Sequence, residues 1–232
     1  MPNPLYMPFD MLYVYLVLIP LAFTIWAQIK IKSNFKKYSQ QRTQRGITGA
    51  QAAYEVLRRA GVSGVRIERV GGKLTDHFDP RTNVIRLSEA VHDTASVTAV
   101  GVAAHEAGHA IQYATAYAPM KFRSAIIHVT NFGSKLSLPL IILGSIMGMT
   151  GLINLGIFLF GLVVVFQLVT LPVEFNASRR AVKILSESGL LTQEEIPGSK
   201  KVLSAAALTY IAALAVSLGQ LLRFVLMARR RR

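Results

Sequence analysis

The sequence predicts a mainly α-helical membrane protein, in which transmembrane helices are combined with a small α+β domain that contains a short antiparallel sheet. Of the 232 residues, 52% are hydrophobic and only 16% are charged, a low charged fraction for a soluble protein. Several apolar runs are long enough to cross a hydrocarbon core about 30 Å thick. One stretch, residues 46–118, carries helical and strand patterns instead, and this stretch predicts the α+β domain.

The first apolar run, residues 11–29, predicts a transmembrane anchor. Asp10 precedes it, and four lysines follow it: Lys30, Lys32, Lys36 and Lys37. A cleaved signal peptide would carry its positive charge before the run, so we expect this segment to remain as an anchor. Because lysines near the end of a span favour the cytoplasm, the N-terminus is expected outside and the following chain inside.

Within residues 46–118, the first helix is expected to begin at a capping box formed by Thr48 and Gln51 and to end at Gly61. Alternating apolar residues between 65 and 87 predict the antiparallel sheet, with its last strand, residues 84–87, at an edge. A long buried helix over residues 95–117 is expected to follow, with Thr94 as its N-cap.

Two further apolar runs within residues 129–171 predict a helical hairpin that crosses the membrane twice. Residues 172–200, which contain the candidate third ligand, connect this hairpin to a last apolar helix, residues 202–228, whose length predicts a further span. Four crossings would place the C-terminal arginines outside, against the usual charge rule, whereas three would not.

The charge balance indicates a lipid partner. The net charge is +14, but the basic residues lie beside apolar runs and do not interleave with aromatic residues, so we expect anionic lipid headgroups and no nucleic acid as the counterpart. The chain has no cysteine, so a zinc site would need His, Asp or Glu ligands. No pattern in the chain indicates an oligomeric state.

The pentapeptide HEAGH lies inside the long buried helix and carries the strongest chemical signal. His105 and His109 are four residues apart and therefore share a helix face, where two imidazoles can bind one metal ion. Glu106 is placed to take a proton from a metal-activated water. Gly108 is explained equally well by close helix packing and by a need for room at the metal.

A third ligand must come from elsewhere in the chain. The candidates are His77, His92, Asp93, His128 and Glu174. Glu174 is favoured because it follows Pro172 at the predicted cytoplasmic end of a span, where an acidic residue is costly unless it is paired. A salt bridge to Arg179 or Arg180 is the alternative explanation of this glutamate.

Several strings along the chain, DHFDP (76–80), RLSE (86–89), HEAGHAIQ (105–112), EFNASRRA (174–181) and AAALTY (205–210), resemble the bacterial neutral zinc metallopeptidases of the YugP type. The resemblance covers nearly the whole chain and extends distantly to the HtpX-type membrane proteases. It implies a zincin-like domain and a membrane-embedded zinc endopeptidase with Glu174 as the downstream glutamate ligand. In HtpX-type proteins the position four residues after this glutamate is often Asp, whereas here it is Ser178.

The sequence therefore predicts an integral protein of the bacterial cell membrane that binds one zinc ion per chain through His105, His109 and Glu174 and cleaves peptide or membrane-protein substrates. Glu106 is the expected general base, and the active site is expected on the cytoplasmic side. The strand at residues 84–87 is expected to hold an extended substrate, and His77 is a candidate for stabilising an oxyanion, with a half-exposed position on a strand as the alternative. The alternative function is a catalytically inactive zinc-binding scaffold or regulator in the membrane.

Overall fold

The structure is a computed structural model that describes residues 11, 14–72 and 74–230. Leu12 and Tyr13 of the predicted anchor, and Arg231 and Arg232 of the terminal arginine cluster, lie outside the described residues. The described chain is mainly helical, as predicted, with one small sheet. It divides into two compact units, the first drawn from residues 1–28, 122–171 and 209–232 and the second from residues 29–121 and 172–208.

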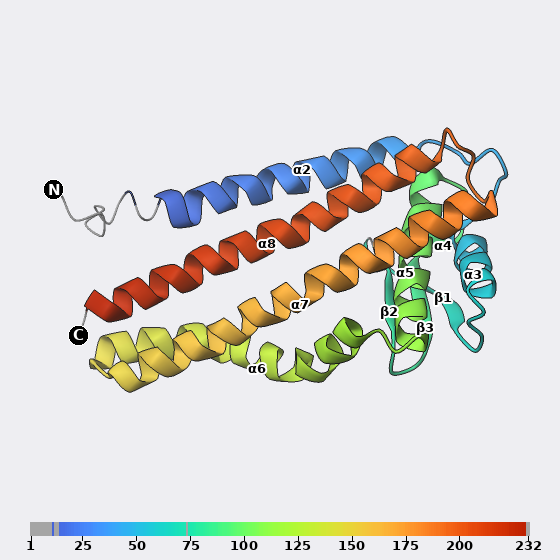
Figure 1. Ribbon diagram of the computed structural model, residues 1–232. Coiled ribbons are helices and arrows are strands. Elements are labelled where there is room, and N and C mark those ends of the chain that lie inside the picture. The colour runs from blue at the N-terminus through green and yellow to red at the C-terminus, as the bar shows by residue number, and fades with distance from the viewer. Residues whose placement is uncertain (1–10, 12–13, 73, 231–232) are drawn as a thin grey trace. The chain divides into compact units, whose positions relative to one another are not determined.

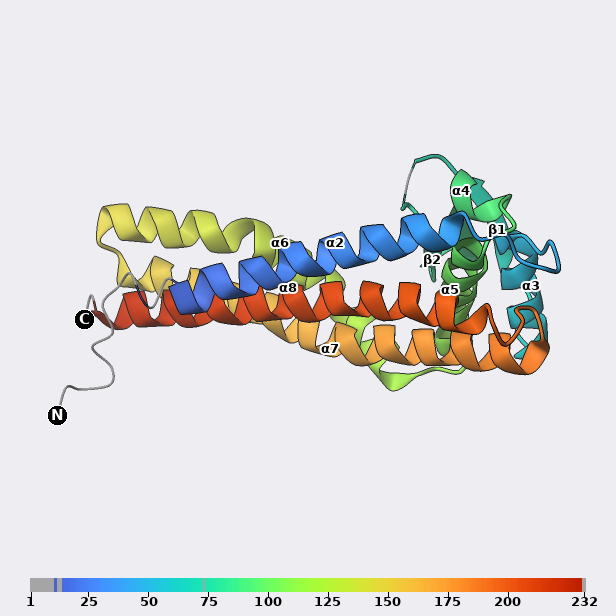
Figure 2. The same ribbon diagram turned by 90° about the horizontal axis from the view of Figure 1, so that it is seen from above.

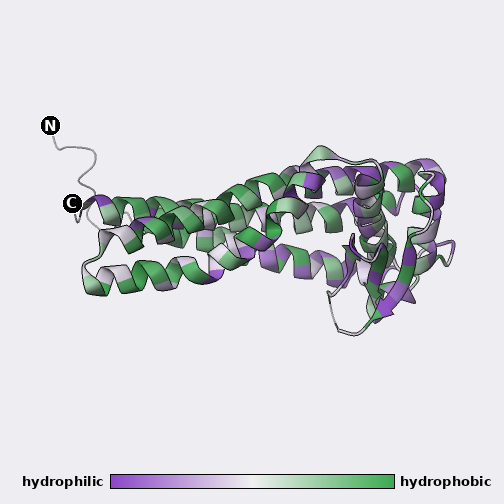
Figure 3. Ribbon diagram, turned by 90° about the horizontal axis from the view of Figure 1, so that it is seen from below, coloured by the Kyte–Doolittle hydropathy of each residue, from purple (hydrophilic) through white to green (hydrophobic). Residues whose placement is uncertain are grey.

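Four helices of the described chain are long and apolar enough to cross a membrane. They comprise Val14–Ser39, which joins a π-helical turn η1 (Val14–Leu18) to α2 (Ile19–Ser39), together with α6 (Ala118–Met147), α7 (Thr150–Ser188) and α8 (Ile196–Arg230). Figure 3 shows hydrophobic residues predominating along α6 and the first half of α7. Large apolar side chains on these helices are exposed, for example Ile146 at 78% and Phe132 at 66%. Soluble proteins rarely expose such surfaces, whereas lipid covers them.

The helices α6 and α7 pack closely through small residues. A Cβ atom on Gly156 of α7 would lie 2.7 Å from the Ser137 carbonyl oxygen of α6, so only glycine lets the two backbones approach this closely. Gly148, at φ 68°, lies between the two helices in the left-handed conformation that glycine adopts without strain.

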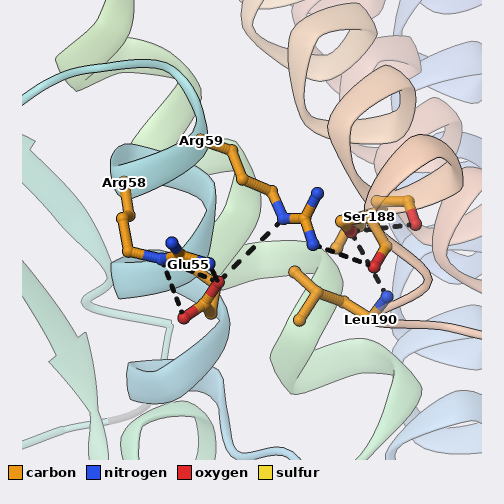
Figure 4. Close-up of polar contacts among 6 residues, drawn as sticks. Glu55, Arg58, Arg59, Ser188 and Leu190 are labelled. Carbon is orange, nitrogen blue, oxygen red and sulfur yellow. Dashed lines mark hydrogen bonds and ion pairs between the residues drawn. The ribbon is translucent and has the colours of Figure 1, made fainter.

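The helix α7 does not end near Pro172, where the apolar span was expected to stop, but runs on to Ser188. Proline costs a helix one backbone hydrogen bond, and this loss is tolerated in long apolar helices when neighbouring groups compensate. The continuation places Glu174 and Ser178 one helical turn apart on a rigid element. In Figure 4, the Arg59 Nη2 atom of α3 (Gly49–Arg59) donates to the Ser188 carbonyl oxygen at 3.3 Å, which satisfies a free carbonyl at the end of α7.

The first helix of the second unit, α3, begins as the sequence predicts. Thr48 accepts a hydrogen bond from the Gln51 backbone N–H, and the Gln51 side chain accepts one from the Thr48 backbone N–H, which completes the capping box. Gly61 follows the helix in the left-handed conformation, at φ 68°. The apolar side of α3 is buried and belongs to the main core, which it shares with α5 (Val97–Ala114).

The sheet is mixed, which corrects the prediction of an antiparallel sheet. Its strands β1 (Arg66–Val70), β2 (His77–Asp79) and β3 (Val84–Ser88) lie in the order β1–β3–β2. β1 pairs with β3 in parallel, and β2 pairs with β3 antiparallel. The segment after β1 carries the chain to the far side of β3, so β2 does not fold back on β1 as a hairpin would.

The expected edge strand, residues 84–87, is therefore the central strand of the sheet. Val84, Ile85 and Leu87 are fully buried in β3. Because both of its edges are already paired, β3 cannot accept an extended peptide as a further strand. The prediction that this strand holds the substrate was wrong.

The HEAGH helix is α5, preceded by the short helix α4 (Glu89–His92). Its N-cap is Ser96, whose side chain accepts from the Ala99 backbone N–H at 3.2 Å, and not Thr94 as the sequence suggested. Most of α5 is buried. The helix therefore forms the rigid centre of the second unit, to which α3 and the 172–188 part of α7 add the rest of the core.

Candidate metal centre

His105 and His109 lie one turn apart on the same face of α5, as their spacing predicts. Their Nε2 atoms are 3.1 Å apart, and the two rings meet edge to face at an interplanar angle of 82°. His109 is buried, and His105 is half-buried. The two imidazoles thus point to one position beside the helix.

Glu174 of α7 completes a cluster with the two histidines. Its Oε2 atom lies 3.2 Å from the His105 Nε2 atom and 3.4 Å from the His109 Nε2 atom. The glutamate is only 3% exposed. The structure thus brings Glu174 to the histidines, and Arg180, one of its alternative partners, instead donates from Nε to the Asn176 Oδ1 atom at 2.8 Å.

The separations within this cluster fit a zinc ion. Ligand atoms about 2.0–2.2 Å from a tetrahedral zinc ion lie about 3.3–3.6 Å from one another. The three observed separations, 3.1, 3.2 and 3.4 Å, approach this range. Two imidazole nitrogens and one carboxylate oxygen are also the donor set of many catalytic zinc sites, which leave the fourth position for water. His105, His109 and Glu174 could therefore hold a metal ion.

A second layer of polar side chains orients both imidazoles. The His105 Nδ1 atom is 3.1 Å from the Ser178 hydroxyl, and the His109 Nδ1 atom is 3.0 Å from the Gln112 Oε1 atom. When the Nδ1 protons are donated to these oxygens, each Nε2 atom keeps a free lone pair for a metal. Ser178, at the position where HtpX-type proteins often have Asp, thus contacts His105 through its hydroxyl group.

Gln112 is itself held in place, because it is fully buried and all of its polar atoms are used. Its Nε2 atom donates to the Val173 carbonyl oxygen at 2.7 Å and to the Asn176 Oδ1 atom at 3.0 Å. These bonds join α5 to α7 beside the histidines. Sequence reasoning missed Gln112 and Asn176, although a polar residue three positions after His109 in an otherwise apolar helix was a usable signal.

Gly108 is explained by close packing of two helices. A Cβ atom at this position would lie 2.7 Å from the Ala177 carbonyl oxygen and 3.2 Å from the Ala177 Cα atom. These are backbone atoms of α7, which cannot rotate away. The glycine therefore allows α5 and α7 to approach, and this approach brings Glu174 to the histidines.

Glu106 is 8% exposed and is not a member of the three-residue cluster. Its negative charge nevertheless acts on the cluster. Burial works against a positive charge on His109, but the hydrogen bond to Glu174 and the charges of Glu106 and Glu174 outweigh burial and raise the pKa of His109. At a given pH, His109 therefore takes up a proton more readily than an ordinary histidine.

The other ligand candidates lie elsewhere. His77 is exposed on β2, where its Nδ1 atom donates to the Thr75 carbonyl oxygen at 2.7 Å. The His92 Nδ1 atom is 2.7 Å from the Asp93 Oδ1 atom. His128 belongs to α6, in the other compact unit. His77, His92, Asp93 and His128 thus do not join the His105–His109–Glu174 cluster. Among the residues that the structure describes, this cluster is the group of side chains that could hold a metal ion.

Fold and site together define a class of protein: a mainly helical, membrane-type protein with a buried cluster of two histidines and one glutamate suited to a metal ion. Comparison with known proteins gives the family. The chain belongs to the family described as "putative neutral zinc metallopeptidase", whose sequence profile matches residues 13–229. It is 48% identical over 216 residues to the "Putative membrane protease YugP" of Bacillus subtilis (strain 168), and the match covers 93% of this chain and 96% of that protein. No solved structure matches the chain.

Proposed function

We propose that this chain is a membrane-embedded zinc endopeptidase that binds one zinc ion through His105, His109 and Glu174 and hydrolyses peptide bonds with Glu106 as general base. The observation that carries the proposal is the convergence of the three ligand atoms, 3.1–3.4 Å apart. Glu106 directly follows the ligand His105 on α5, and its negative charge acts on His109. Membership of a zinc metallopeptidase family supports it. The substrates would be peptides or segments of membrane proteins.

Each residue of the site has a separate part in this chemistry. When bound, zinc lowers the pKa of its water to about 7 and polarises a carbonyl group. The Glu106 carboxylate accepts the proton of the attacking water and later gives it to the leaving amine nitrogen as the C–N bond breaks. Ser178 and Gln112 hold the imidazoles so that their Nε2 atoms face the metal position.

Two isosteric substitutions separate the base from the ligand. In Glu106→Gln, the proton acceptor is lost and the three ligands remain, so we expect zinc content to be unchanged and peptide cleavage to fall by about 10²- to 10⁴-fold. In Glu174→Gln, a charged ligand is replaced by a weak neutral one, so zinc affinity and cleavage should fall together. Zinc content by elemental analysis and cleavage of casein, measured on the same purified protein, test both expectations.

Added zinc separates the two variants further, because it should partly restore peptide cleavage by Glu174→Gln but not by Glu106→Gln. If Glu174→Gln held zinc as tightly as the parent, Glu174 would not be a ligand. If the zinc-loaded parent cleaved casein no faster than Glu106→Gln, the inactive zinc-binding scaffold would be the better account.

We also propose that the site faces the cytoplasm of a bacterial cell. Lys30, Lys32, Lys36 and Lys37 directly follow the first apolar run, and this charge asymmetry favours a cytoplasmic location for the next segment. If all four candidate helices cross, residues 30–121 and 172–208 fall on the same side, which agrees with their grouping in one compact unit.

A C-terminal tag tests this topology. Four crossings place the tag outside the cell, so protease should remove it from right-side-out vesicles and spare it in inside-out vesicles. A cytoplasmic tag would contradict four crossings. It would favour a model in which α8 does not cross the membrane.

A further inference from the structure

A basic groove lies between the start of α8 and the end of α2, on the second compact unit. In Figures 1 and 2 these two helix segments run side by side, and the Asn34 Nδ2 atom of α2 donates to the Lys201 carbonyl oxygen of α8 at 3.3 Å. The groove has a volume of about 570 Å³, which is within the usual size range of ligand sites.

The α2 wall of the groove is one helix face. Lys30, Asn34 and Lys37 line it at intervals of four and three residues, the spacing that aligns side chains along a helix. The Tyr38 ring lies beside them, with the Lys37 Nζ atom 5.5 Å from its centroid. Tyr38 is buried because Gly198 of α8 has no Cβ, which would otherwise lie 2.7 Å from the ring.

The α8 wall changes from basic to apolar along its length. After Pro197 come Lys200 and Lys201, and the lining then continues with Ser204, Ala205 and Leu208. After Thr209 and Tyr210, α8 continues with an apolar run. On the other wall, the apolar run of α2 ends at Ile29, just before Lys30. The lysines therefore stand where two apolar helices leave the expected hydrocarbon region, at the level of lipid headgroups.

The positive charge of the groove indicates an anionic ligand. Four lysines line the groove, and among the described residues that line it none is Asp or Glu. Like charges on two facing helices repel each other, so an anion bound between them would be stabilised by all four. Ser204 adds a hydroxyl group that can donate to a phosphate oxygen.

We propose that this groove binds the phosphate headgroup of an anionic phospholipid. The lysines would pair with the phosphodiester of the headgroup. Basic pockets between membrane helices are suited to such headgroups. The site is separate from the metal cluster and does not depend on the proposed peptidase activity.

The test uses the full-length protein, purified in detergent and titrated with phosphatidylglycerol or phosphatidylcholine, with bound lipid counted by native mass spectrometry. The groove variant Lys37→Gln/Lys200→Gln removes one charge from each wall. The matched control Lys32→Gln/Lys36→Gln removes two charges from the same region of α2, at exposed positions outside the groove lining.

We expect the parent and the control to bind phosphatidylglycerol in preference to phosphatidylcholine. The groove variant should bind phosphatidylglycerol about 30-fold more weakly, since each lysine near an anionic lipid contributes about fivefold. The charge-keeping variant Lys37→Arg/Lys200→Arg should retain the affinity. If the double variant does not fold, Lys37→Gln and Lys200→Gln should each lose about fivefold.

Three results would overturn the proposal. Equal losses in the groove variant and the control would mean diffuse attraction by surface charge. Equal binding of the two lipids would mean that the net negative charge of the headgroup is not recognised, because both lipids carry a phosphodiester and only phosphatidylcholine neutralises it with a cation. Displacement of the lipid by inorganic phosphate or by an acidic peptide, at concentrations at which a short-chain phosphatidylglycerol is ineffective, would assign the groove to a soluble anion.

Discussion

Gly108→Ala adds one methyl group where α5 and α7 are closest. The new Cβ atom would lie 2.7 Å from the Ala177 carbonyl oxygen, and ordinary van der Waals contact begins at 3.4 Å, so the helices must move apart by about 0.7 Å (3.4 − 2.7). The obstacle is backbone, which cannot turn aside.

This displacement bears directly on the proposed zinc site. His109 is the next residue of α5, and Glu174 is three residues before Ala177 on α7. Zinc–ligand distances tolerate only about 0.2 Å, so a 0.7 Å separation of the helices should disturb the ligand set. We expect zinc affinity to fall at least about tenfold, as it does when residues that support a metal ligand are altered.

Stability should change less than zinc affinity. Overpacking costs about 1–3 kcal/mol, but alanine gains about 1 kcal/mol over glycine in a helix, which leaves a net loss of about 0–2 kcal/mol. Zinc affinity, measured by competition with a fluorescent chelator, is therefore the sharper assay.

Gly101→Ala is the matched control on the same helix. Its Cβ atom would meet the Ser199 hydroxyl, the movable end of a side chain, and the position is one turn away from His105. Zinc affinity should stay close to that of the parent. If Gly108→Ala bound zinc as tightly as Gly101→Ala, the close approach at Ala177 would not position the ligands.

The hydrogen bond between His109 and Gln112 and the raised pKa of His109 each give a further prediction. Gln112→Leu keeps the side-chain volume but removes the acceptor for the His109 Nδ1 atom, so zinc affinity should fall about 10- to 100-fold while zinc still binds at saturation. Unchanged affinity in chelator competition would exclude this role of Gln112. The pKa of His109 is raised above its ordinary value of 6.5, so protons compete with zinc for this imidazole at a higher pH than they would for a histidine of ordinary pKa. As the pH falls, zinc release should therefore begin at a higher pH. Zinc retention in equilibrium dialysis from pH 8 down to pH 5 checks this direction.

Local sequence patterns predicted the parts of this protein that depend on neighbouring residues. The shared face of His105 and His109 follows from the helical repeat, and the capping box at Thr48 and Gln51 needs only adjacent backbone N–H groups. The long apolar helices follow from the length of uninterrupted hydrophobic sequence. Even here, Thr94 and Ser96 are both acceptable caps, and only the hydrogen bond to Ala99 shows that Ser96 begins the helix.

The order of strands was not predictable in the same way. Alternation of apolar residues gives a strand and its buried face, but it does not say which strands are neighbours. The burial of Val84, Ile85 and Leu87 on a central strand follows from the path of the chain after β1, and that path depends on packing against the helices. The turn-forming pair Gly71-Gly72 after the first strand made an antiparallel hairpin the expected connection.

The sequence determined some residues of the candidate site, and the tertiary structure determined the others. The sequence by itself determined the HEAGH pair, and it favoured Glu174 over other candidates partly through a resemblance. Only the tertiary structure brought Glu174 and Ser178 to the two imidazoles, because α5 and α7 are far apart in the chain and meet at a point set by Gly108 and Ala177. Spacing along one helix is a local property, whereas contact between two helices depends on the fit of their whole surfaces.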